Sequence, residues 1–193
     1  MAYLRATLLL TAASLALAGC SPAKTDDSAA KDDTATPAAS DPIASAMSAA
    51  PNAVAKNAAM VEMQADGTMK TLREGTNGFT CMGDSPATPG PDPMCMDANA
   101  MGWAMAWIGH KPPPTDKPGV MFMLAGGTDA SNTDPYATKP TEGGDWVKTG
   151  PHMMVVGSSA ALAGYPSGAA PDTAAPYVMW AGTPYAHLMI PVS

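Results

Sequence analysis

The sequence contains few charged residues, and basic residues are the scarcer kind. Charged residues make up 14% of the chain, and 10 Lys and Arg stand against 17 Asp and Glu, which gives a formal net charge of -7. Because the neutralisation of phosphates supplies most of a protein's affinity for nucleic acid, a chain without a basic cluster is not expected to bind one. The same composition argues against docking to acidic lipids through a polybasic patch.

The sequence also lacks an apolar run of the roughly 20 residues that a membrane-spanning helix needs. A shorter apolar run, residues 8–17, follows Arg5 and precedes Ala18-Gly19-Cys20. A basic start, a short apolar stretch and small residues before a cleavage site are typical of a secretory signal peptide. We therefore expect residues 1–19 to be a signal peptide that is removed.

The end of this segment, Leu17-Ala18-Gly19-Cys20, resembles the lipobox of bacterial lipoproteins. The resemblance implies that Cys20 becomes a lipidated N-terminus, which anchors the protein to a membrane without spanning it. Ser21 fits the sorting pattern of Gram-negative outer-membrane lipoproteins, which implies the periplasmic face of the outer membrane. The alternative is an ordinary cleaved signal peptide and an unmodified cysteine.

Cysteine is scarce, since the chain has only three. With Cys20 lipidated, Cys81 and Cys95 form an even pair in an oxidising compartment, which predicts a disulfide. Such a bond would close a loop of about 15 residues and contribute on the order of 3 kcal/mol in the chain-entropy model. The alternative for these two cysteines is a soft-metal site.

Several motifs of common enzymes are absent as well. The sequence has no P-loop, dinucleotide-binding fingerprint, His-Glu-x-x-His, Cys-x-x-Cys-His or Gly-x-Ser-x-Gly. We therefore favour a protein that is not an enzyme. A hydrolase with an unrecognised site is left as a third possibility, after the two functions given below.

The pattern along the chain predicts one domain of α+β class. Residues 20–41 carry the lipidated cysteine and a polar stretch rich in Ala, Asp, Ser and Thr, which we expect to be a disordered tether. Residues 42–193 have the length of a single globular domain. Asp41-Pro42 marks a helix start, Asp66-Gly67 marks a hairpin, and Asn77-Gly78 marks a second turn of a β-meander.

The rest of the domain is expected to be one main apolar helix packed on a mixed or antiparallel sheet. The helix is predicted over residues 93–109, and buried strands are predicted over residues 120–124, 153–156, 177–180 and 188–192. Long polar loops at residues 125–145 and 157–176 connect these strands. Loops of such length often carry function or short helices.

Methionine is the unusual component. Fifteen of the 16 methionines follow residue 41, and Met94-Cys95-Met96, Met121-x-Met123 and Met153-Met154 suggest a Cu(I) site, since thioethers and thiolates select soft metals. Residues 42–193 contain only four Leu, three Ile and two Phe, so most methionines are expected to fill the core. Copper or another metal therefore remains an alternative, and no cofactor is predicted.

Two of the three histidines, His152 and His187, follow proline turns and begin buried strands. On parallel neighbouring strands they would lie at one end of the sheet, and on antiparallel strands at opposite ends. A shared site could bind a metal or transfer protons near neutral pH. The alternative is a pair of rim histidines bonded to the loop backbone.

An oxygen-rich cluster, Asp129, Ser131, Asn132 and Asp134, could hold Ca²⁺ or could form turns without any ligand. With the histidines and nearby aromatic residues, it defines the candidate ligand-binding set. The set is His152, His187, Asp129, Asn132, Asp134, Tyr136, Trp180 and Tyr185.

Five stretches of the chain resemble a group of uncharacterised bacterial exported proteins. They are residues 75–82, 92–97, 126–137, 149–152 and 177–187. The resemblance covers most of residues 42–193 and implies an intact family domain, but no activity.

These observations predict a membrane-anchored, periplasm-facing lipoprotein that binds a small ligand or a protein partner. The alternative is a metal-handling or metal-dependent protein that uses His152 and His187 with Met or Asp ligands.

Overall fold

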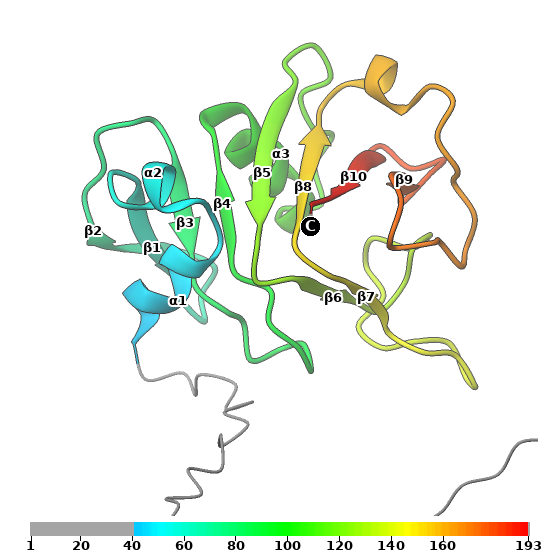
Figure 1. Ribbon diagram of the computed structural model, residues 1–193, viewed down its shortest axis with the longest axis horizontal. Coiled ribbons are helices and arrows are strands. Elements are labelled where there is room, and N and C mark those ends of the chain that lie inside the picture. The colour runs from blue at the N-terminus through cyan, green and yellow to red at the C-terminus, as the bar shows by residue number, and fades with distance from the viewer. Residues whose placement is uncertain (1–40, 193) are drawn as a thin grey trace, which may run out of the picture. The chain divides into compact units, whose positions relative to one another are not determined.

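The computed structural model describes residues 41–192, so the predicted signal peptide, Cys20 and the tether lie outside the described residues (Figure 1). The helices of the described part are α1 (Pro42–Ser48), α2 (Asn52–Ala55), α3 (Ala98–Ile108) and the 3-10 helix η1 (Ser159–Leu162). The strands are β1 (Ala59–Met63), β2 (Met69–Arg73), β3 (Thr80–Met82), β4 (Met94–Met96), β5 (Gly119–Met123), β6 (Gly127–Asp129), β7 (Val147–Thr149), β8 (His152–Val156), β9 (Tyr177–Met179) and β10 (His187–Pro191). None of the described helices combines the length and the apolar character that a membrane crossing requires.

Eight of these strands form one sheet in the order β2-β1-β3-β4-β5-β8-β10-β9. Neighbours are antiparallel except β1 and β3, which pair in parallel, so the sheet is mixed. β6 and β7 form a separate two-stranded sheet. The expected mixture of helix and sheet is confirmed, and of the two sheet types expected, mixed or antiparallel, the sheet is mixed. β5, β8, β9 and β10 occur where apolar runs predicted strands.

The hairpin at Asp66-Gly67 is also confirmed. β1 and β2 pair antiparallel up to Met63 and Met69, and Gly67 adopts a φ of 80°, which glycine accepts without strain. The Asp66 carboxylate accepts a hydrogen bond from the Thr68 backbone N–H at 2.9 Å. The turn is therefore held by its own residues.

The predicted meander is wrong after this hairpin. β3 does not pair with β2 but with the other edge of β1, in parallel. The connecting segment is held beside α2, because the Asn77 amide donates to the Val54 carbonyl oxygen at 2.8 Å and the Thr76 N–H donates to the Asn57 carbonyl oxygen. These contacts carry the chain past α2 and return it along β1.

The predicted start of the long helix at Pro93 is also wrong. Residues 94–96 form β4, which pairs with β3 on one side and β5 on the other, and α3 begins only at Ala98. Asp97 caps the helix, since its carboxylate accepts hydrogen bonds from the N–H groups of Ala100 at 2.8 Å and Val120 at 3.0 Å. The helix ends at Ile108, before Gly109.

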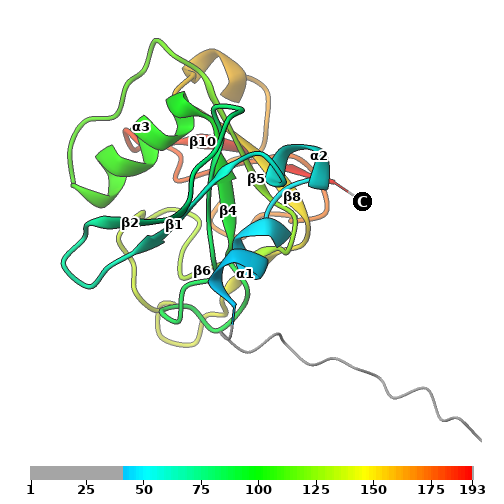
Figure 2. The same ribbon diagram turned by 90° about the vertical axis from the view of Figure 1, so that its left-hand side faces the viewer.

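The helices cover opposite faces of the sheet, as Figure 2 shows, with α3 on one side and α1 and α2 on the other. α1 packs against β1 and β3, whereas α3 packs against β4, β5 and β8. The buried side chains accordingly form two clusters, one on each face.

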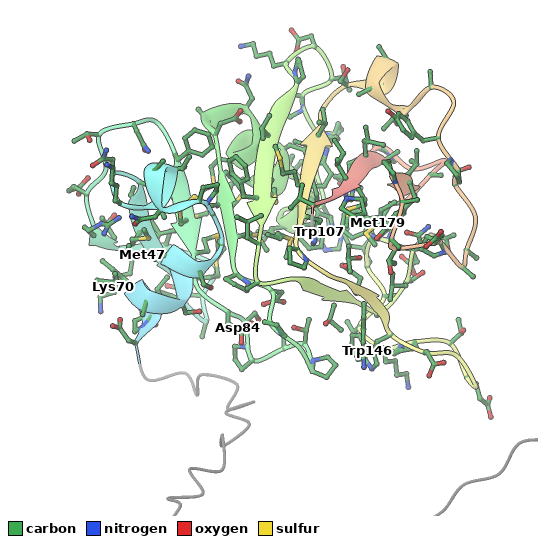
Figure 3. The ribbon with its side chains drawn as sticks, in the orientation of Figure 1. Met47, Lys70, Asp84, Trp107, Trp146 and Met179 are labelled. Carbon is green, nitrogen blue, oxygen red and sulfur yellow. A yellow bond between two sulfur atoms is a disulfide. The ribbon has the colours of Figure 1, made fainter. Side chains whose placement is uncertain are left out.

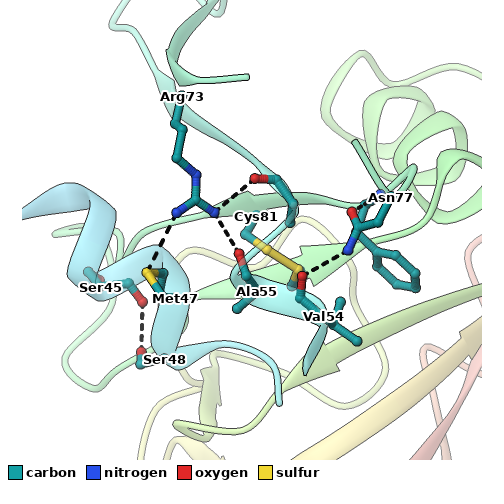
Figure 4. Close-up of a disulfide and its surroundings, with 11 residues drawn as sticks. Ser45, Met47, Ser48, Val54, Ala55, Arg73, Asn77 and Cys81 are labelled. Carbon is teal, nitrogen blue, oxygen red and sulfur yellow. Dashed lines mark hydrogen bonds between the residues drawn. A yellow bond between two sulfur atoms is a disulfide. The ribbon is translucent and has the colours of Figure 1, made fainter. Parts of the chain in front are cut away.

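Cys81 and Cys95 lie directly opposite each other on β3 and β4, at disulfide distance and fully buried (Figure 4). Nearby, the Arg73 guanidinium donates hydrogen bonds to the carbonyl oxygens of Ala55 at 2.6 Å and Ala58 at 2.9 Å. These contacts tie β2 to the end of α2. We name the cluster of buried residues on this face the disulfide core: Ala46, Ala49, Ala50, Ala55, Ala58, Met60, Cys81 and Cys95.

Candidate functional site

The sheet face beneath α3 carries methionine at repeated positions. In β5 and β8 the side chains alternate between buried and half-buried, so residues two apart share a face. Met123 lies opposite His152 and Met121 lies opposite Met154. Further out, Met96 of β4 lies opposite Met121, and Met189 of β10 lies opposite Met154. On the edge strand β9, Met179 lies opposite His187.

A cavity of about 120 Å³ lies between this face and α3. An engineered apolar cavity of about 150 Å³ can hold benzene, so this space suits a small molecule or an ion. Figure 3 labels Trp107 of α3 and Met179 of β9, two of its lining residues. We call it the Met–His pocket, and its lining is Met94, Met121, Met123, Met154, Met179, Met189, His152, His187, Trp103, Trp107, Trp180, Ala104, Thr88, Asp92, Thr128 and Asp129.

His152 presents an unpartnered nitrogen within this lining. Its Nδ1 is 2.8 Å from the Gly150 carbonyl oxygen, and since a carbonyl only accepts, Nδ1 carries the proton and Nε2 carries a lone pair. Nε2 is buried without a hydrogen-bond partner, and the residue is 1% exposed. Burial lowers the pKa of His152 from its ordinary value, so the imidazole is neutral at neutral pH.

His187 has the same tautomer. Its Nδ1 lies 2.9 Å from the Tyr185 carbonyl oxygen and donates to it. Burial, with a smaller effect of His152, lowers the pKa of His187 to about 4. The ring meets the indoles of Trp103 and Trp180 edge to face, with centroid distances of 5.2 and 4.9 Å.

The two histidines stand on antiparallel strands, β8 and β10, which is the arrangement that puts them at opposite ends of the sheet. His152 lies opposite Pro191, four residues from His187, which is roughly 13 Å along the strand. Both nevertheless line the Met–His pocket, because the cavity extends along the face between them. Their backbones are too far apart to form a compact two-histidine site.

Two carboxylates also line the pocket. Burial is the main cause that raises the pKa of Asp92 to about 6, although the N–H of Ser85 and the hydroxyl of Thr88 donate to its oxygens. Burial and the charge of Asp92 raise the pKa of Asp129 to about 6. These groups add negative charge to the lining mainly above pH 6.

The candidate set from the sequence is divided by the structure. Four of its residues line the pocket: His152, His187, Asp129 and Trp180. The other four, Asn132, Asp134, Tyr136 and Tyr185, lie outside this lining. The buried Asn132 amide donates to the Gly168 carbonyl oxygen at 2.6 Å, and Asp134 accepts from the Tyr136 N–H at 2.9 Å, so both support loop conformation.

Tyr136 and Tyr185 form a chain of hydrogen bonds beside the pocket. The Tyr136 hydroxyl donates to the Tyr185 hydroxyl at 2.8 Å, and the Tyr185 hydroxyl donates to the Lys111 carbonyl oxygen at 2.9 Å. The Tyr185 ring also meets the Trp103 indole edge to face. Tyr185 therefore packs against the aromatic wall of the pocket, which consists of Trp103, Trp107 and Trp180.

Within residues 41–192, no group of three or more His, Cys, Asp or Glu side chains is placed to hold a metal ion. A metal in the Met–His pocket would need ligands of another type, and methionine thioethers are the ones that line it.

Sequence reasoning missed Asp92, Thr88, Thr128 and the tryptophans of α3 as site residues. Thr88 and Asp92 come from the loop between β3 and β4, Thr128 from β6 and the tryptophans from α3, so their selection depends on how these segments pack on the same face of the sheet. The sequence does contain a signal for the methionine-rich face, since side chains of this kind recur two residues apart, which is the period of a strand. The pairs are Met94 and Met96, Met121 and Met123, and His152 and Met154.

No protein-family model, curated protein or solved structure matches the chain. The fold and the site therefore define its class by themselves. It is a mixed α/β protein whose eight-stranded sheet carries a methionine-lined pocket with a buried, neutral histidine nitrogen.

Proposed function

We propose that this protein is a non-enzymatic binding lipoprotein that holds a small ligand in the Met–His pocket. In this proposal lipidated Cys20 anchors it to the periplasmic face of the outer membrane, and α3 is the main apolar helix that closes the pocket. Anchoring would raise the local concentration of the binding domain near the membrane.

The observation that carries the proposal is the unpartnered Nε2 of His152. A buried polar atom without a hydrogen bond costs roughly 1–3 kcal/mol. A ligand that accepts this lone pair, either as a hydrogen-bond donor or as a metal ion, would recover that free energy. The apolar walls of the cavity would supply the rest of the affinity by excluding water.

The orientation of the histidines favours binding over catalysis. A catalytic histidine is commonly oriented by a carboxylate at Nδ1, which stabilises the protonated ring. Here the Nδ1 atoms of His152 and His187 donate to backbone carbonyls, and burial lowers both pKa values. Such rings are weak general bases but good neutral ligands.

The test uses the lipidated protein in detergent, labelled with ¹⁵N. The chain has only three histidines, so its imidazole nitrogen resonances can be assigned individually. Two probes engage a lone pair in different ways: pyrrole donates a hydrogen bond, and Ag(I) coordinates it. We expect at least one of them to shift the His152 Nε2 resonance saturably, while the ring of His110, outside the pocket, stays unchanged.

N-methylpyrrole, which has the same shape without the donor, is the matched control for pyrrole. The variant Ala104→Leu is the matched control for the cavity, since Ala104 lines it and a larger side chain would fill it. The proposal is overturned if neither probe moves the His152 resonance, or if Ala104→Leu binds the probes as well as the wild type.

A further inference from the structure

We infer that the ligand of the Met–His pocket is a soft monovalent cation, Cu(I), held by the Nε2 atom of His152 and by methionine sulfurs, of which Met123 is the first. This inference rests on the proposed binding function and names its ligand. The supporting observations are the orientation of the His152 ring, the position of Met123 and the flanking thioethers.

The His152 ring is already set as a metal ligand. Histidines that bind metals almost always donate the other ring N–H to a carbonyl or a carboxylate, which fixes the tautomer and the ring orientation. The Gly150 carbonyl oxygen plays this part at 2.8 Å from Nδ1. Because Nδ1 donates to this carbonyl, Nε2 carries the lone pair and is available to a cation.

The geometry places the Met123 side chain beside this ring. It lies directly opposite His152 across β5 and β8. A Cβ atom added to Gly127 would lie 3.1 Å from Cε1 of His152, 3.2 Å from Cε of Met123 and 3.7 Å from Nε2 of His152. The end of the Met123 side chain and the coordinating edge of the imidazole therefore approach one common point, which only a glycine at position 127 leaves open.

Two further sulfurs flank this pair. Met154 follows His152 by two residues on the same face of β8, about 7 Å along the strand, and Met94 comes from β4, the strand on the other side of β5. Both line the pocket. Methionine has three rotatable bonds, so either side chain can turn its sulfur toward a cation near Nε2.

The chemistry of this ligand set favours a soft, monovalent ion. Thioethers select Cu(I), whereas Ca²⁺ and Mg²⁺ require oxygen ligands and structural Zn²⁺ takes Cys, His or carboxylate groups. The thioethers and the imidazole are neutral, and the burial of a charge without compensation is expensive. Asp92 and Asp129 line the same pocket and would compensate the charge of a bound cation, so the preference for Cu(I) rests on the thioether ligands.

The experiment measures the affinity of the lipidated protein for Cu(I) without oxygen, by competition with bicinchoninate. Loss of a residue that hydrogen-bonds to a metal ligand weakens metal binding by about 10- to 100-fold, so loss of a ligand itself should weaken it at least as much. We expect this for His152→Phe, which keeps a ring but no nitrogen, and for Met123→Leu, which keeps the volume but no sulfur. Met60→Leu is the matched control, because Met60 is equally buried but belongs to the disulfide core.

Gly127→Ala keeps every ligand atom and adds a methyl group at the common point. It should weaken Cu(I) binding as well. If His152→Phe fails to fold, Gly127→Ala still tests the site, and thermal unfolding of each variant shows whether it is folded. X-ray absorption of the copper complex should show nitrogen and sulfur neighbours, and the sulfur contribution should fall in Met123→Leu.

The results separate this inference from the proposed function. If pyrrole binds at His152 but Cu(I) and Ag(I) do not, the pocket binds a small molecule and the cation inference is wrong. If neither pyrrole nor the cations bind, both proposals fail. If Cu(I) binds equally well to Met123→Leu, His152→Phe and Gly127→Ala, it occupies methionines elsewhere and the inference is overturned.

Discussion

The two faces of the sheet are packed with different side chains. Under α1 and α2, the disulfide core consists of five alanines, one methionine and the cysteine pair. Under α3, the buried cluster consists largely of methionine and aromatic residues around a cavity. Small side chains allow close approach of helix and sheet, whereas long and planar side chains span a wider gap and leave space between them. The first face is closely packed, and the second leaves the space of the Met–His pocket.

The buried ionisable groups with shifted pKa values follow the same division, whereas unpartnered polar atoms occur on both faces. On the α3 side, Nε2 of His152 and Nε1 of Trp103 are buried without hydrogen-bond partners, and four ionisable groups in the pocket lining have shifted pKa values. On the other side, Arg73 satisfies two carbonyl oxygens at the end of α2, although its own Nε is also buried without a partner. The buried ionisable groups of the pocket lining therefore distinguish that side, and the disulfide core is expected to supply the stability that they cost.

The largest effect is expected from the aromatic wall of the pocket. Trp103 is 3% exposed and stacks with Trp107 and Trp180 at centroid distances of 6.5 and 6.2 Å. Trp103→Ala should lower the free energy of unfolding by about 3–5 kcal/mol, measured in urea. The control Met105→Ala, on the same helix but 36% exposed, should change it by less than about 1 kcal/mol. Equal effects of the two variants would mean that this wall is not a packed core.

The next effect concerns the disulfide core. The cysteines are separated by 14 positions, and the double variant Cys81→Ser with Cys95→Ser should lose on the order of 3 kcal/mol. Binding of Ag(I) to the remaining folded protein should stay the same, because the pocket lies on the other face. Thermal unfolding and the His152 resonance measure the two properties. A loss of binding without a loss of stability would reverse the roles assigned to the two faces.

A third effect concerns pH. Because His187 is buried on the pocket face, we expect the free energy of unfolding to depend on pH. The pKa of His187 is about 4 in the folded protein against an ordinary 6.5, so the unfolded chain binds a proton first as the pH falls. His187 therefore destabilises the fold progressively between pH 6.5 and 4 and has no such effect above this window. The loss should reach about 1.4 kcal/mol per pH unit.

His187→Phe isolates this contribution, because His152, Asp92 and Asp129 titrate in both proteins and cancel to a first approximation in the difference. The free energy of unfolding of the variant minus that of the wild type should rise steadily on acidification from pH 6.5 to 4. A difference that stays constant over this range would show that His187 is not held neutral by burial.

The parts of the fold that the sequence predicts correctly depend on neighbouring residues. The Asp66-Gly67 hairpin follows from the turn chemistry of two adjacent residues, and β5, β8, β9 and β10 follow from apolar runs bounded by Gly and Pro. The parallel pairing of β3 with β1 depends on contacts such as Asn77 with Val54, between residues 23 positions apart. Periodicity contains no information on such contacts, so a meander was the simpler expectation.

The candidate site shows the same limit. His152, His187, Asp129 and Trp180 were identified by residue type and by position near strand ends. Asp92 could not be, because it comes from the loop between the two cysteines and reaches the pocket only after β3 and β4 have paired. The antiparallel order of β8 and β10, which separates the histidine backbones, was likewise open until the sheet order was known.

The smallest effects give the sharpest comparison of the two faces, because the same substitution can be made on each. Ala46 of α1 is fully buried in the disulfide core, whereas Ala104 of α3 is 4% exposed and lines the cavity. Leucine and alanine both favour helix, so helix propensity nearly cancels between the two sites. Ala46→Leu should overpack its surroundings and destabilise the protein by about 1–3 kcal/mol. Ala104→Leu should fill free space and stabilise it by about 0.5–2 kcal/mol.

Urea unfolding of both variants against the wild type measures this contrast. Because the two alanines are similarly buried on helices that face the same sheet, a difference in sign must come from the space around them. Destabilisation of similar size at both sites would mean that the cavity under α3 closes in solution, and the Met–His pocket would then have no room for a ligand. Opposite signs would show that the protein keeps this space open at the expense of its own stability, as a binding site requires.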